Sequence, residues 1–221
     1  MKYLPCVEIE PTETAGASVI WLHGLGANGH DFEPIVPELG LGEDTSVRFV
    51  FPHAPQIAVS INNGMKMPAW YDITDLDLGR TIDQTQLQQS AKEIEKLIAR
   101  ENERGVPSQK IIIAGFSQGG AVGYEIALSY QDTLAGLIAL STYFATKETV
   151  QYSAANKSLP IFIGHGNHDQ MVVSNLGVSA HEILKEKKYP VEYHTYEVAH
   201  GVHLQEIKDI GIWISKILEL E

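Results

Sequence analysis

The sequence has little cysteine, few basic residues and no long apolar run, and each shortage excludes a class of protein. The single cysteine, Cys6, cannot form an internal disulfide, and we expect an inert thiol in a reducing compartment. Lys and Arg number 16 against 28 Asp and Glu, which gives a net charge of −12. Such a surface repels nucleic-acid phosphates and anionic lipid head groups. We therefore expect no nucleic-acid partner.

Stable membrane insertion is not expected either, because no segment reaches the roughly 18 consecutive apolar residues of a spanning helix. The N-terminal stretch is interrupted by Pro5 and then carries Glu8 and Glu10, so an export signal is not expected. These absences predict a cytoplasmic protein. With 221 residues, of which 44% are hydrophobic, the chain can bury a full core, and we expect a single domain over 1–221.

Short apolar runs alternate with segments of helical periodicity, which is typical of a mostly parallel sheet with helices on both faces. The segment 31–39 contains Pro34 and Pro37, so it can hold only a short helical turn. The predicted fold class is α/β. We expect strands at 19–22, 47–51, 110–114, 134–140, 159–164 and 191–198, and helices at 84–104, after 117, at 174–188 and at 204–220.

The sharpest local pattern is Gly-Phe-Ser-Gln-Gly at 115–119, which follows an apolar strand and precedes a run of small residues. In this context G-x-S-x-G indicates a tight turn that exposes a nucleophilic serine at the edge of the sheet. The glycines allow close backbone approach, and the helix that follows offers unpaired N–H groups to a developing oxyanion. Ser117 is the predicted nucleophile.

A catalytic serine needs a base and an orienting acid, and both follow it in the expected chain order. Asp169 stands in the loop after the fifth predicted strand, and His200 in the loop after the sixth. His203 is the alternative base, but it adjoins the terminal helix, whereas His200 stands beside Gly201 in the loop. We therefore predict a catalytic triad of Ser117, Asp169 and His200.

The Gly-rich loop after the first predicted strand is the candidate source of oxyanion donors. We assign the backbone N–H of Leu25 and that of Gln118. The same loop also reads G-x-G-x-x-G at 24–29, with Asp44 twenty residues on, so a dinucleotide-binding oxidoreductase is the alternative from a different class. Pro34 and Pro37 argue against it, because they interrupt the helix that should bind the pyrophosphate.

A metal site is a further alternative, because several histidines and one aspartate stand near the ends of predicted strands. Their spacing fits no common metal motif, and we expect neither a metal nor an organic cofactor. The candidate ligands would be His165, His168, Asp169, His200 and His203.

The long segment 53–83 carries too many large apolar side chains for a solvated loop, so it either forms a lid or lines an acyl pocket. Our candidate substrate-binding residues are Met65 and Trp70 in this segment and Val172 after the candidate aspartate. The segment 141–144 is a candidate for a second wall.

Six motifs together resemble the phospholipase/carboxylesterase family, which includes bacterial carboxylesterases and acyl-protein thioesterases. They are LHGLGANGHDF, FPHAP, MPAWYDI, GFSQGGAV, GHG-x-x-D and HGVHLQEIKDIGIW, and they run in order from residue 22 to 213. The resemblance implies a compact α/β-hydrolase without a large cap domain, the same triad, and a possible homodimer.

The residues and the resemblance agree on a serine carboxylesterase that acts on carboxylic esters or thioesters through an acyl-enzyme. Acyl-protein thioesterase and lysophospholipase activities are alternatives on the same triad. The absence of a basic or amphipathic membrane patch favours small soluble esters.

Overall fold

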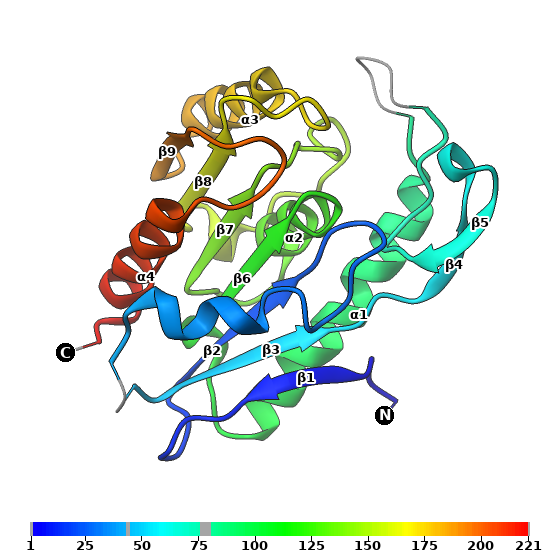
Figure 1. Ribbon diagram of the computed structural model, residues 1–221. Coiled ribbons are helices and arrows are strands. Elements are labelled where there is room, and N and C mark those ends of the chain that lie inside the picture. The colour runs from blue at the N-terminus through cyan, green and yellow to red at the C-terminus, as the bar shows by residue number, and fades with distance from the viewer. Residues whose placement is uncertain (1, 43–44, 76–80, 221) are drawn as a thin grey trace.

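The computed structural model describes residues 2–42, 45–75 and 81–220, and its centre is a seven-stranded sheet (Figure 1). The strand order is β1-β3-β2-β6-β7-β8-β9, in which β1 pairs antiparallel to β3 and the other neighbours pair in parallel. The strands are β1 (Cys6–Ile9), β2 (Ala17–Leu22), β3 (Val47–Pro52), β6 (Ile111–Phe116), β7 (Gly136–Leu140), β8 (Ile161–Gly166) and β9 (Val191–Tyr196).

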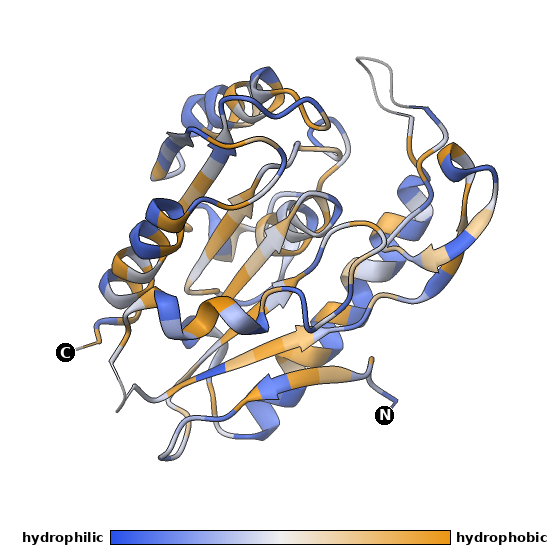
Figure 2. Cartoon of the chain, in the orientation of Figure 1, coloured by the Kyte–Doolittle hydropathy of each residue, from blue (hydrophilic) through white to orange (hydrophobic). Residues whose placement is uncertain are grey.

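Side chains of the central strands alternate between two apolar clusters, one on each face of the sheet. In β2, Ile20 and Leu22 belong to the cluster beneath α1 (Gln84–Glu103), α2 (Gln118–Ser129) and α3 (Ser174–Glu186). Val19 and Trp21 belong to the cluster beneath α4 (Leu204–Leu218) and the 3-10 helix η1 (Glu33–Leu39). Burial of both faces explains why these strands are almost continuously apolar, as the orange strands in Figure 2 show.

The predicted α/β class and its sheet with helices on both faces are confirmed. All six predicted strands and all four predicted helices are present, and the proline-containing segment forms only the short η1. The sequence analysis missed β1, which is short and only half-buried. It also missed the hairpin of β4 (Gln56–Val59) and β5 (Met65–Pro68), which stands apart from the main sheet (Figure 1).

The 3-10 helix η1 and the helix α4 are packed directly on one another. Gly211 of α4 approaches the end of η1 so closely that a Cβ atom there would overlap the carbonyl oxygen of Leu39. The glycine is therefore required by a close backbone contact, at the cost of its lower helix propensity.

We expect Gly211→Ala to lower the free energy of unfolding by about 2 kcal/mol, because the clash outweighs the gain in helix propensity. Urea-induced unfolding followed by circular dichroism measures this. Ile212→Ala, at the next position and 69% exposed, serves as the control and should change stability little. Equal stability of Gly211→Ala and the native chain would contradict the close contact.

The first turn of α4 contains a fully buried carboxyl group. Glu206 is 0% exposed, and its Oε2 accepts the N–H of His203 at 3.1 Å in a capping box. Its Oε1 has no hydrogen-bond partner in the part of the chain that the structure describes. Burial raises the pKa of Glu206 to about 7, an effect that the His203 N–H opposes and nearby Asp209 reinforces.

This pKa makes stability depend on pH, because between pH 4.5 and about 7 the folded chain binds a proton that the unfolded chain releases. The contribution of Glu206 to stability therefore falls as the pH rises through that window. Glu206→Gln keeps a side-chain acceptor for the cap and removes the charge. We expect it to raise the free energy of unfolding by about 2 kcal/mol more at pH 8 than at pH 5.

Urea denaturation at the two pH values measures this difference. The exposed Glu182→Gln provides the control and should show the same pH dependence as the native chain. If Glu206→Gln showed the same pH dependence of stability as the native chain, the buried carboxyl would not titrate in this range.

Candidate active site

Ser117 lies on a strained turn between β6 and α2. Its φ of 53° and ψ of −117° fall outside the usual regions for a residue with a side chain. Both backbone polar groups of Ser117 are held by the end of β7 and the residues after it. The Ser117 N–H donates to the Leu140 carbonyl at 2.9 Å, and the Thr142 hydroxyl donates to the Ser117 carbonyl at 2.6 Å.

Glycines around Ser117 make the turn possible. A Cβ at Gly119 would lie 2.5 Å from the carbonyl oxygen of Leu22, at the end of β2, and a Cβ at Gly115 would overlap the backbone of Gly119. A side chain at Gly120 would lie 2.6 Å from Thr142. The predicted turn is therefore wedged between two strands, which leaves room for no Cβ at these positions.

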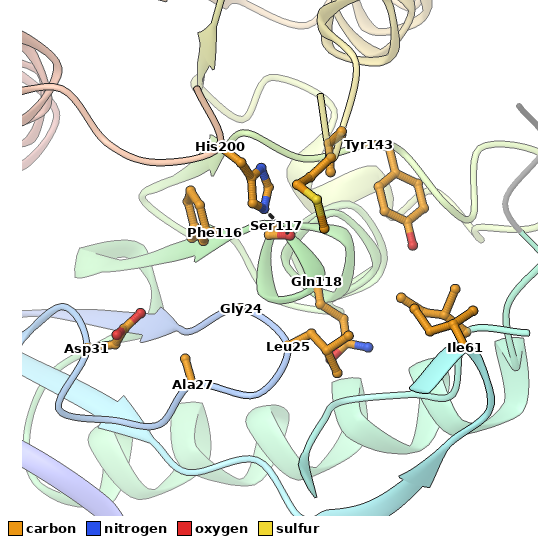
Figure 3. A pocket seen from close by; sticks show the side chains of 13 residues that line it. Gly24, Leu25, Ala27, Asp31, Ile61, Phe116, Ser117, Gln118, Tyr143 and His200 are labelled. Atoms are coloured by element: carbon orange, nitrogen blue, oxygen red, sulfur yellow. Dashed lines mark hydrogen bonds between the residues drawn. The ribbon is translucent and has the colours of Figure 1, made fainter. Parts of the chain in front are cut away.

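His200 and Asp169 complete a hydrogen-bonded chain with Ser117. His200 Nε2 lies 3.0 Å from Ser117 Oγ, and His200 Nδ1 lies 2.7 Å from Asp169 Oδ2. Because a carboxylate can only accept, Nδ1 carries the proton and donates to it, which leaves Nε2 free to accept the serine proton. The three residues follow β6, β8 and β9, so they meet at the carboxyl edge of the sheet. Figure 3 shows the hydrogen bond between Ser117 and His200 as a dashed line.

The carboxylate of Asp169 is held in its charged form. Burial raises its pKa, but the hydrogen bond from His200 and those from the backbone N–H groups of Val172 and Met171 outweigh burial and bring the pKa below its usual value. Both N–H groups donate to Oδ1, at 2.8 and 2.9 Å. The orienting group is thus fixed by its own loop.

His165 braces that loop from the interior. Its Nε2 hydrogen-bonds the carbonyl oxygen of Val172 at 2.8 Å and lies 3.7 Å from Asp169 Oδ2. Burial lowers the pKa of His165 and outweighs the opposing contacts with Val172 and Asp169.

The other two candidate metal ligands, His168 and His203, are placed differently. His168 is exposed and pairs with Glu197 at 2.9 Å, and His203 caps α4 with its side chain. No group of three or more His, Cys, Asp or Glu residues within the described ranges is arranged to hold a metal ion.

The two predicted oxyanion donors lie beside Ser117. Leu25 and Gln118 both line the cavity that contains Ser117 and His200. Gln118 is the first residue of α2, where backbone N–H groups have no partner within the helix. The positive end of the helix dipole and a backbone N–H without an intrahelical partner therefore stand next to Ser117 in the chain.

The side chain of Gln118 has a structural task that the sequence analysis missed. Its Oε1 accepts the Trp70 N–H at 2.8 Å, and its Nε2 donates to the Tyr71 carbonyl at 2.7 Å. The indole N–H of Trp70 in turn donates to the His23 carbonyl at 2.8 Å. One buried network therefore joins the nucleophile turn to the loop that contains Leu25.

His23 fixes the start of that loop. Its Nε2 accepts the Ala54 N–H at 3.1 Å, so Nδ1 carries the proton and donates to the Gly24 carbonyl at 2.7 Å. Burial lowers the pKa of His23 and so favours this neutral form.

The dinucleotide-binding alternative needs a long helix after the Gly-rich loop, and the structure has only the short η1 there. Asp44, the ribose ligand of that alternative, lies outside the described residues.

The cavity at Ser117 has a volume of about 280 Å³ and mostly apolar walls. Val172, one of the three candidate substrate-binding residues, lines it, as does Tyr143 of the predicted second wall. Met65 lies on β5 with 65% exposure, and Trp70 is 1% exposed within the network of Gln118; neither is among the lining residues. The lining is completed by Gly24, Leu25, Ala27, Asp31, Ile61, Ile73, Phe116, Ser117, Gln118, Met171 and His200.

Met65 and Trp70 were chosen because large apolar side chains gather in the segment 53–83. Of that segment, Ile61 and Ile73 contribute to the cavity instead. Residues 76–80 of the segment lie outside the described residues. Sequence periodicity gave no means of telling which apolar side chains face the cavity, because the hairpin β4–β5 and the Gln118 network together turn the chain there.

No helix in the described ranges is long and apolar enough to span a membrane.

The sequence matches the phospholipase/carboxylesterase family over residues 5–218.

Acyl-protein thioesterase 1 of Yarrowia lipolytica is 37% identical over 98% of this chain and 98% of its own. A second protein of that name, from Neurospora crassa, is 38% identical over 91% of this chain and 87% of its own. Among solved structures, SOBER1 of Arabidopsis thaliana superimposes with a TM-score of 0.84 at 32% identity, over 91% of this chain and 99% of that one. The chain is therefore an α/β-hydrolase and belongs to the phospholipase/carboxylesterase family of ester hydrolases.

Proposed function

We propose that this chain is a serine carboxylesterase that hydrolyses carboxylic esters or thioesters through an acyl-enzyme formed on Ser117. The observation that carries the proposal is the hydrogen-bonded chain from Ser117 Oγ to His200 Nε2, 3.0 Å, and from His200 Nδ1 to Asp169 Oδ2, 2.7 Å. The strained turn that presents the hydroxyl to an apolar cavity supports it.

In the first half-reaction His200 Nε2 takes the Ser117 proton while Oγ attacks the carbonyl carbon. The N–H groups of Leu25 and Gln118 stabilise the oxyanion, each contributing roughly 3 kcal/mol to the transition state. The bond to the leaving oxygen or sulfur then breaks, and His200 donates its proton to that atom.

In the second half-reaction water attacks the acyl-enzyme, with His200 as the base, and releases the carboxylic acid and free Ser117. Asp169 stabilises the imidazolium that forms in both halves and keeps the ring in the productive tautomer. The reaction needs no metal or organic cofactor, so we propose that none takes part.

The cavity of about 280 Å³ favours short acyl chains, because it is at the small end of the range for ligand pockets. The acyl-protein thioesterase alternative is favoured by the names of the two relatives at 37% and 38% identity. Lysophospholipase activity is a third possibility on the same triad. A single domain over 1–221, a cytoplasmic location and a homodimer stay predictions.

We expect the native chain to hydrolyse p-nitrophenyl esters, and Ser117→Ala to lower kcat by about 10⁴-fold or more because the nucleophile is lost. Initial rates for a series of esters from acetate to palmitate, followed at 405 nm with EDTA present, give both the rate and the preferred chain length. The best substrate should be a short ester.

Thr149→Ala, a substitution of another hydroxyl away from the cavity, is the control and should keep native activity. Full activity of Ser117→Ala would overturn the acyl-enzyme proposal, and loss of native activity in EDTA that zinc restores would favour a metal enzyme. A palmitoyl thioester preferred over butyrate would support the acyl-protein thioesterase alternative.

A further inference from the structure

The cavity at Ser117 has two chemically different ends. Figure 3 shows Ile61 and Tyr143 on one side of Ser117, and Asp31 with Ala27 on the other side, below Phe116. The first end is apolar and includes Ile73, because the Ile61 N–H donates to the Ile73 carbonyl at 3.1 Å. The second end carries a carboxylate.

Among the described lining residues, Asp31 is the one with a carboxyl group, and none of the others is a Glu, Lys or Arg. Its side chain is exposed and forms no hydrogen bond or ion pair with any residue in the described ranges. The nearby acid Glu33 is different, because it pairs with His30 at 2.7 Å. The Asp31 carboxylate is therefore available to a ligand in the cavity.

The two ends can be assigned to the two halves of an ester. An acyl chain is apolar and suits the end formed by Ile61, Ile73 and Tyr143. The leaving group must lie beside His200, which gives it a proton. The His200 ring packs against Phe116 with 4.8 Å between centroids, and Phe116 stands on the side of Asp31. The leaving group therefore extends toward Asp31.

We propose that Asp31 is a specificity-determining residue that selects esters and thioesters whose leaving alcohol or thiol carries a cationic group, such as an ammonium or a guanidinium. The proposal rests on the proposed function, since it concerns the leaving group of that reaction. The net charge of −12 acts in the same direction and disfavours anionic leaving groups such as phosphate-bearing thiols. The electrostatic interaction of Asp31 with His23 does not compete with a bound cation, because burial favours the neutral form of that imidazole by lowering its pKa.

Three thioesters of butanoic acid test the proposal, because they share the acyl group and differ in the charge of the thiol. The thiols are thiocholine, its neutral isostere 3,3-dimethylbutanethiol, and the anion 2-mercaptoethanesulfonate. Thiol release gives kcat/KM for each with the native chain, Asp31→Asn and Glu33→Gln. The last variant removes one charge close by but outside the cavity, so it controls for the change in net charge.

We expect the native chain to prefer the cationic to the neutral thioester by about three- to fivefold at low salt, which is the scale of an exposed ion pair. Asp31→Asn should reduce that ratio to near one, chiefly by lowering kcat/KM for the cationic thioester. Glu33→Gln should retain the native ratio. At about 0.5 M NaCl the native preference should shrink, because salt screens exposed charges.

Equal cation-to-neutral ratios for the native chain and Asp31→Asn would overturn the proposal. If the neutral thioester is hydrolysed and Ser117→Ala is inactive, that result leaves the proposed function intact, whereas no turnover of any of the three thioesters overturns both.

A second pair of substrates identifies the source of the cation. S-Butanoyl-cysteine peptides with either lysine or glutamine beside the cysteine present the charge on a peptide instead of a small thiol. A lysine preference that Asp31→Asn removes supports basic acyl-peptides as substrates; a preference confined to thiocholine supports small cationic thiols.

Discussion

The structure depends on one close backbone contact, the packing of the Ser117 turn against the end of β2. Gly119 meets the carbonyl of Leu22 with no room for a Cβ, and Gly115 meets the backbone of Gly119 in the same way. This contact brings the proposed nucleophile beside the loop that follows β2, where the proposed oxyanion donor Leu25 lies. The φ of 53° at Ser117 is a local cost that is offset by the buried strands on both sides.

Buried hydrogen bonds then fix the loops that this contact brings together. The amide of Gln118 holds the backbone at Trp70 and Tyr71, and the indole of Trp70 holds the carbonyl of His23. On the other side of the site, His165 holds the Val172 carbonyl in the loop that orients Asp169. A catalytic geometry needs side chains fixed to fractions of an ångström, and these buried hydrogen bonds restrict the movement of the loops.

The cavity beside Ser117 is apolar on one side and carries a carboxyl group on the other. Its apolar walls come from segments far apart in the chain, including Ile61, Tyr143 and Val172, whereas its single carboxylate comes from Asp31, just before η1. The packing of α4 on η1 at Gly211 links the two elements that follow the His200 loop and the Asp31 segment. Thus the positions of the proposed base and of the proposed cation-binding residue rest on the same helix contact.

The sequence by itself determined the order of the six parallel strands and the four α-helices, because buried parallel strands must be continuously apolar and surface helices must carry one apolar face. It also predicted the juxtaposition of Ser117, Asp169 and His200, since each follows a strand of one parallel sheet and so meets the others at its carboxyl edge. Only the tertiary structure decided which large side chains face the cavity. Trp70 is turned inward by hydrogen bonds to partners 47 and 48 residues away, and Met65 is carried outward on a hairpin. Such contacts between distant segments leave no periodic pattern in the chain.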